Sequence, residues 1–127
     1  RTTLGPAGYA MAPHAGAPAV TALLCFSTCP DADAARRIAD ALVEARLAAC
    51  VSVLPGVQST YRWQGAIEHA QEQLLLIKTT HEAWPALQSR LRELHPYELP
   101  ELLAVEAAGL PDYLQWIARE ADARTAP

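Results

Sequence analysis

Two cysteines near the start of the sequence are spaced like a metal or redox pair. Cys25 and Cys29 stand four positions apart in an apolar stretch. In an extended strand four residues cover about 13 Å, whereas thiolates that share a zinc ion each lie about 2.3 Å from it. We therefore expect no shared metal: Cys25 is predicted to be a small core hydrophobe and Cys29 a loop thiol.

One histidine stands where it could do chemistry. His95 follows an amphipathic stretch and precedes Pro96. At a helix end a cationic imidazole interacts favourably with the helix dipole, and this capping role is the structural interpretation. The functional interpretation is a ligand or acid–base group, with Glu98 and Glu101 close by in the chain. The sequence contains no nucleophile elbow, phosphate loop, zinc-finger spacing or H-E-x-x-H motif, so both interpretations stay open.

The composition bounds the class of protein. The chain has 127 residues, 51% of them hydrophobic, with a formal net charge of −4, which fits one domain with its own core. A mildly acidic chain without a polybasic cluster favours neither nucleic acid nor an anionic membrane surface as a partner. No apolar run reaches the roughly 18 residues of a spanning helix. Three cysteines, an odd number, predict reduced thiols and a cytoplasmic location.

The elements that must position these residues follow from periodicity. An apolar run over 20–28 predicts a buried strand, and Asp31 or Asp33 is a suitable N-cap for the helix after it. That helix has an apolar stripe of Ala35, Ile38, Ala39, Leu42, Val43 and Arg46 at three- and four-residue spacing.

A long β-hairpin is predicted from 47 to 79. Pro55-Gly56 predicts a bulge or kink in its first strand, and Gln64-Gly65 predicts the reversal. Leu74 to Ile77 is apolar on both faces, whereas residues nearer the tip are polar. The hairpin therefore has a buried root and a projecting arm. Tyr61 and Trp63 on this arm are either interface aromatics, the favoured interpretation, or a ligand platform.

The second half of the chain repeats the helix–strand pattern. Thr79 to Glu82 has the form of a capping box, an amphipathic helix runs over 84–94, and 101–107 reads as a last strand before a short helix near Pro111. The predicted class is α+β, with a ferredoxin-like βαββαβ order, a C-terminal helix and the long projecting hairpin. Residues 1–18 are expected to be a flexible leader, 19–120 the single domain and 121–127 a tail.

Five stretches, in this order and at this spacing, resemble the CutA family of divalent-cation tolerance proteins: 45–51 (ARLAACV), 61–65 (YRWQG), 76–80 (LIKTT), 95–101 (HPYELPE) and 113–116 (YLQW). The resemblance covers about residues 20–118. It implies a ferredoxin-like subunit in a homotrimer, joined by strands and hairpin arms, and a link to tolerance of copper and other divalent ions. It implies no required cofactor, and no membrane or nucleic-acid partner.

The resemblance also implies candidate site residues. The trimer of the family is similar to that of the PII signalling proteins, an analogy of fold alone, which suggests clefts for a small ligand between subunits. The motif positions expected to line such clefts are Cys50, Tyr61, Trp63, Lys78, His95, Tyr97 and Glu101.

The sequence departs from one pattern of the family. In some bacterial members the copper ligands are proposed to be a cysteine late in the first strand and two consecutive histidines before Pro-Tyr. Ser27 and Leu94 occupy two of these positions here, and His95 alone remains. Soft Cu(I) sites want thiolates or thioethers, so we expect weak, imidazole-led binding of copper or another divalent cation at His95.

Four functions compete at this point. The leading one is a trimeric metal-response or binding protein that is not an enzyme. The second is a sensor that binds a small anion between subunits, with Lys78 and His95 as cationic groups. The third is an enzyme that uses His95 and Glu101 for acid–base work, and the fourth is a structural trimer that anchors other proteins.

Overall fold

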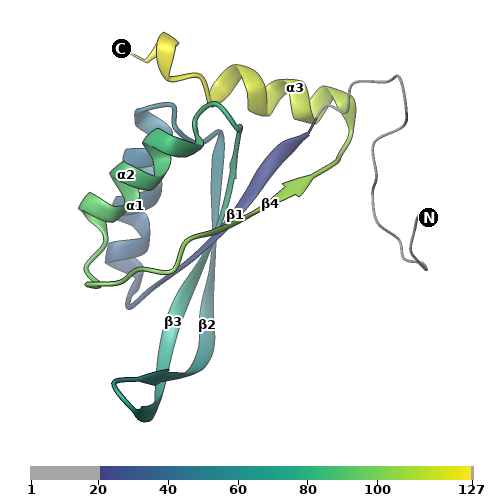
Figure 1. Ribbon diagram of the computed structural model, residues 1–127. Coiled ribbons are helices and arrows are strands. Elements are labelled where there is room, and N and C mark those ends of the chain that lie inside the picture. The colour runs from purple at the N-terminus through teal and green to yellow at the C-terminus, as the bar shows by residue number, and fades with distance from the viewer. Residues whose placement is uncertain (1–20, 127) are drawn as a thin grey trace, which may run out of the picture.

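The computed structural model describes residues 21–126; the predicted leader 1–18 lies outside them. Four strands form one antiparallel sheet in the order β2-β3-β1-β4. This is the predicted ferredoxin-like α+β fold (Figure 1). The elements are β1 (Ala22–Cys29), α1 (Ala32–Glu44), β2 (Cys50–Trp63), β3 (Ala66–Thr79), α2 (Trp84–Leu94), β4 (Leu103–Ala107), α3 (Pro111–Glu120) and the short 3₁₀ helix η1 (Ala123–Thr125). Within 21–126 no helix is both long and apolar enough to cross a membrane.

Helix α1 begins and packs as its sequence predicts, with one exception. The Asp31 carboxylate caps it by accepting a 2.8 Å hydrogen bond from the Ala34 amide. Ile38 and Leu42 are fully buried against the sheet. The expectation for Val43 was wrong: its side chain is 42% exposed, because it sits one position beyond the buried stripe.

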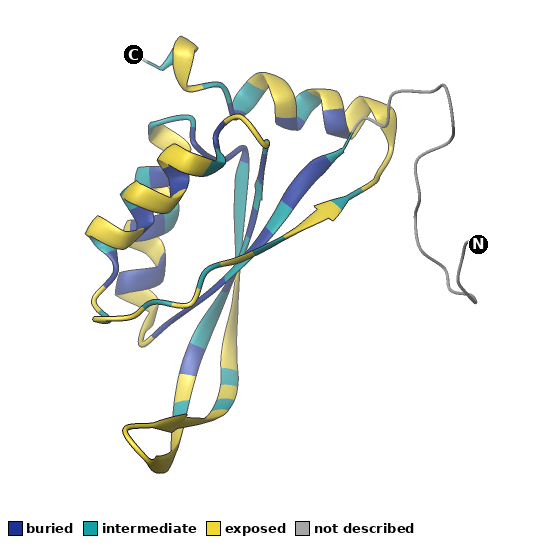
Figure 2. Cartoon of the chain, viewed as in Figure 1, coloured by how far each residue is buried: buried dark blue, intermediate teal, exposed yellow. Residues whose placement is uncertain are grey.

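Helices α1 and α2 cover one face of the sheet, and most of the core lies between them and the two central strands (Figure 2). From β1 this core takes Leu23, Cys25 and Cys29, and from β3 it takes Leu75 and Ile77. The prediction of a loop thiol at Cys29 was wrong, since Cys29 ends β1 and is fully buried.

We call the opposite side of the sheet the open face. Side chains alternate between faces along a strand, so it carries the even-numbered positions of β1 and β3. One row crosses all four strands through Cys50, Lys78, Leu24 and Val105, which are successive partners in the register. The next row runs through Ser52, Leu76, Phe26 and Leu103. Helix α3 packs on Ala22 and Ala49 at one end of the sheet.

The β2–β3 hairpin extends well beyond the helices (Figure 1). The register shifts between Leu54 and Val57, which confirms the bulge predicted at Pro55-Gly56. Gln64 and Gly65 make the reversal with φ of 50° and 83°, the two positive values of a type I′ turn. From Tyr61 to His69 every residue is exposed.

The start of α2 differs from the prediction. Thr79 does not open a capping box, because it is the last residue of β3, where its buried hydroxyl donates a 2.6 Å hydrogen bond to the Leu47 carbonyl. The neighbouring Thr80 hydroxyl instead accepts from the Ala83 amide at 3.1 Å. The chain leaves α2 as an extended segment and reaches β4 after passing the end of β1.

Candidate functional site

His95 lies at the end of β1, where the chain leaves α2. Its Nε2 lies 2.8 Å from the Thr28 carbonyl, and its Nδ1 lies 3.1 Å from the Tyr97 amide nitrogen. A carbonyl only accepts and an amide N–H only donates, so Nε2 carries the proton and Nδ1 does not. The Cys29 sulfur is 3.7 Å from the same Nε2.

Burial determines the charge of this imidazole. His95 is 7% exposed, and desolvation lowers its pKa, more than the bond to Thr28 and the Glu72 carboxylate raise it. The neutral tautomer fits both hydrogen bonds. The helix-end position was predicted correctly, but the capping interpretation assumed a cation, and the structure favours an uncharged ring.

Tyr97 links the same segment to β3. Its hydroxyl donates a 2.6 Å hydrogen bond to Oε2 of Glu72, a carboxylate that is only 6% exposed. Burial, followed by this hydrogen bond, raises the pKa of Tyr97. Glu101 lies nearby, and burial, with the Glu72 charge second, raises the pKa of its carboxyl group. The Glu101 backbone carbonyl accepts a 2.7 Å bond from the Ser27 hydroxyl.

Four side chains at this place are therefore shifted towards their uncharged forms. They are the Cys29 thiol, whose pKa burial raises to about 11 with smaller contributions led by Glu72, the His95 imidazole, the Tyr97 phenol and the Glu101 carboxyl. A nucleophile or general base needs a pKa near the working pH and a free lone pair. Both nitrogens of His95 are occupied, so the arrangement binds and positions the chain rather than activating a nucleophile.

The remaining predicted site residues do not join this cluster within one chain. Cys50 and Lys78 face each other across β2 and β3. Lys78 and Glu72 are six residues apart on β3, which is about 20 Å along a strand. Of the hairpin aromatics, Tyr61 lies close enough to Tyr97 to raise its pKa slightly, and Trp63 pairs with Ala66 beside the turn.

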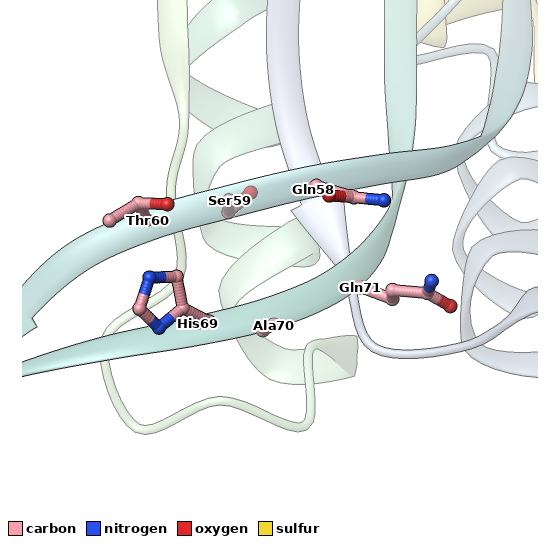
Figure 3. Close-up of a pocket in the computed structure, with 6 residues that line it drawn as sticks. All are labelled: Gln58, Ser59, Thr60, His69, Ala70 and Gln71. Atoms are coloured by element: carbon pink, nitrogen blue, oxygen red, sulfur yellow. The ribbon is translucent and has the colours of Figure 1, made fainter.

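The hairpin arm has a small hollow of about 290 Å³ (Figure 3). Its six lining residues come from three facing pairs of β2 and β3: Gln58 and Gln71, Ser59 and Ala70, Thr60 and His69. None of them is among the predicted site residues. The lining holds amides, hydroxyls and one imidazole but no carboxylate, so it offers few donors for a cation.

Sequence reasoning missed two members of the His95 cluster. Cys29 and Glu72 contact it from 66 residues away and, through Tyr97, from 25 residues away. A buried glutamate in an otherwise polar stretch of hairpin gives no local signal. One sign was available: Cys29 ends the strand, so its side chain was bound to lie near whatever covers the end of the sheet.

The donors at His95 fit a metal ion poorly. Within residues 21–126 no three His, Cys, Asp or Glu side chains are grouped so as to hold one. His95 and Cys29 are two donors of the four that a tetrahedral site uses. The imidazole would also have to give up its bond to Thr28 or to Tyr97.

Comparison with known proteins agrees with this fold. A family model described as "CutA1 divalent ion tolerance protein" matches residues 23–120. The "Divalent-cation tolerance protein CutA" of Thermus thermophilus is 53% identical over 91 residues, which are 71% of this chain and 88% of that protein. By contrast, the chain spans about half the length (52%) of the mouse and human proteins named CutA.

Solved structures give the same result. The crystal structure of CutA from Xylella fastidiosa is 56% identical, with a TM-score of 0.78 over 80% of this chain and 98% of that one. A structure from Archaeoglobus fulgidus, described as a periplasmic divalent cation tolerance protein CutA, is 32% identical, with a TM-score of 0.77 over 80% of this chain and 99% of that one. Sequence and structure thus define a ferredoxin-like divalent-cation tolerance protein. The chain belongs to the CutA1 divalent ion tolerance family.

The neutral state of His95 makes stability depend on pH. Its pKa is lowered in the folded chain, so unfolding near or below its ordinary value of about 6.5 takes up a proton. The contribution is complete above that value and is lost as pH falls through the folded pKa. We predict that the free energy of unfolding rises more between about pH 5 and pH 7.5 in the wild type than in His95→Gln.

Urea unfolding of both chains at the two pH values measures this difference. The raised pKa of Glu101 acts in the opposite direction, but it is present in both chains, as are Glu72 and the other histidines, so these effects largely cancel. An equal pH dependence in the two chains would show that His95 is not held neutral.

Proposed function

We propose that this chain acts as a homotrimeric, non-catalytic protein of divalent-cation tolerance, with a weak metal contact led by His95. Membership of the family supports the link to divalent cations. The observation that carries the rest is the apolar surface that the sheet leaves uncovered on its open face and on the hairpin arm.

Self-association accounts for this surface. The exposed large hydrophobic side chains include Val53, Leu54, Tyr61, Trp63 and Ile67 on the hairpin and Leu103 and Val105 on β4. Both outer strands also have a free edge. Unpaired edges and wide apolar patches mark contact surfaces, and a two-stranded arm is marginal in water by itself. Further copies of the chain would cover all three features and form clefts for a small ligand between them.

The absence of catalysis is proposed from the state of the His95 cluster. Its side chains favour uncharged forms and its hydrogen bonds are used within the chain. Glu101 and His95 therefore make a poor acid–base pair. Their arrangement suits a fixed joint between α2 and the sheet.

A weak metal contact is proposed from the two donors at the same place. The His95 Nε2 and the Cys29 sulfur are 3.7 Å apart, so one ion could contact both if the bond to Thr28 were released. Loss of that bond, and the small number of donors, would keep the affinity low. A cytoplasmic location is part of the proposal and rests on the three free thiols; the periplasmic Archaeoglobus relative shows that location varies in the family.

We predict a trimer that a charge on the open face dissociates. Val105→Lys on β4 removes apolar area worth about 1.5–3 kcal/mol for a buried valine and brings like charges together. Val43→Lys on α1 is the matched control, because Val43 is also an exposed valine, at 42% against 50% for Val105. Sedimentation equilibrium at micromolar concentration should give a trimer for wild type and control and smaller species for Val105→Lys. A monomeric wild type would contradict the proposal.

We predict weak binding of divalent copper that depends on His95. Titration of the full chain in a His14→Asn background removes the histidine nearest the N-terminus. Affinity should fall severalfold in His95→Gln and stay unchanged in His69→Gln, the control on the exposed arm. It should also fall as pH drops through the range where imidazole is protonated. Equal affinities in all three chains would leave His95 with a structural role alone.

A further inference from the structure

Three polar side chains meet on the otherwise apolar open face. The Lys78 ammonium group lies 2.8 Å from the Ser52 hydroxyl and 3.7 Å from the Cys50 sulfur. Cys50 is the cross-strand partner of Lys78, and Ser52 is two positions further along β2 on the same face. A thiol, a hydroxyl and an ammonium group thus form one cluster at the outer edge of the sheet.

The charge of Lys78 is not neutralised within this part of the chain. Among residues 21–126 the ion pairs that lie within 4.0 Å do not include it. A cationic group beside a sulfur atom favours negative charge there, and so promotes reaction of the thiol as a nucleophile. The Ser52 hydroxyl holds the ammonium group in place by accepting its hydrogen bond.

The other two thiols of the chain provide a contrast. Cys25 and Cys29 are 0% exposed, and desolvation raises the pKa of each to about 11. Cys50 is partly exposed. Oxidation of cysteine follows thiolate character and access, and on both grounds Cys50 differs from its two neighbours in sequence.

We propose that Cys50 is a site of oxidation by small hydroperoxides, at which Lys78 and Ser52 stabilise the negatively charged sulfur. In the reaction the sulfur attacks one oxygen of hydrogen peroxide, so that an S–O bond forms and the O–O bond breaks. The leaving hydroxide takes up the proton of the thiol and becomes water. Sulfur is oxidised by two electrons to sulfenic acid, and the peroxide is reduced by the same two.

This inference does not depend on the proposed function, since it concerns one cluster within one chain. Oxidation there would place a polar oxygen on the open face beside the β2 edge. A sulfenic acid is reversible by thiols. The cluster would therefore couple the state of this surface to the redox state of its surroundings.

The test is peroxide treatment of the folded full chain in the presence of dimedone, which traps sulfenic acid. Peptide mass spectrometry then gives the labelling rate of each cysteine. Cys50 should be labelled at least about tenfold faster than Cys25 and Cys29, and this ratio should collapse in urea, where burial no longer distinguishes them. Equal labelling in the folded chain, or no labelling of Cys50, would overturn the proposal. This comparison needs no variant.

Two substitutions test the part played by Lys78. Lys78→Met removes the charge at similar length and should slow labelling of Cys50 by at least about threefold. Lys78→Arg keeps the charge and should restore most of the rate. Circular dichroism checks that both variants fold. Labelling of Cys50 in folded Lys78→Met that is as fast as in wild type would show that the ammonium group has no such role.

Discussion

The sheet is covered by helices mainly on one of its two faces, and most other features depend on this constraint. The central strands β1 and β3 are apolar on both sides, with Leu75 and Ile77 under the helices and Leu74 and Leu76 on the open face. Burial of the second set would stabilise the fold at about 25 cal/mol per Å² of apolar surface. A single chain leaves much of that surface in contact with water, which is why a second and third copy enter the account.

The same constraint explains where polar chemistry is found. Under the helices, at the end of β1, burial favours uncharged forms, and His95, Tyr97 and Glu101 are held by hydrogen bonds to the ends of β1 and β3. On the open face the ammonium group of Lys78 keeps its charge without a carboxylate within the described residues. Residues that the family pattern groups together thus lie in two environments, about 20 Å apart along β3.

Most of the fold followed from sequence because its signals are local. The stripe of α1, the bulge at Pro55-Gly56 and the reversal at Gln64-Gly65 depend on neighbours a few positions away, and each was found. Thr79 was misplaced because a threonine that ends a strand looks like one that caps a helix. Of the candidate site, His95, Tyr97 and Glu101 could be predicted from the family pattern, but Glu72 could not, since its burial depends on a tyrosine 25 residues away.

Amide hydrogen exchange of the two edge strands tests the central claim most directly. If further copies cover the open face and its edges, the amides of β2 near Val53 and of β4 should be protected almost as well as those of β1 at micromolar concentration, and should lose that protection on dilution. If instead the single chain is complete, both edge strands will exchange rapidly at every concentration while β1 and β3 stay protected. That second result would contradict the account.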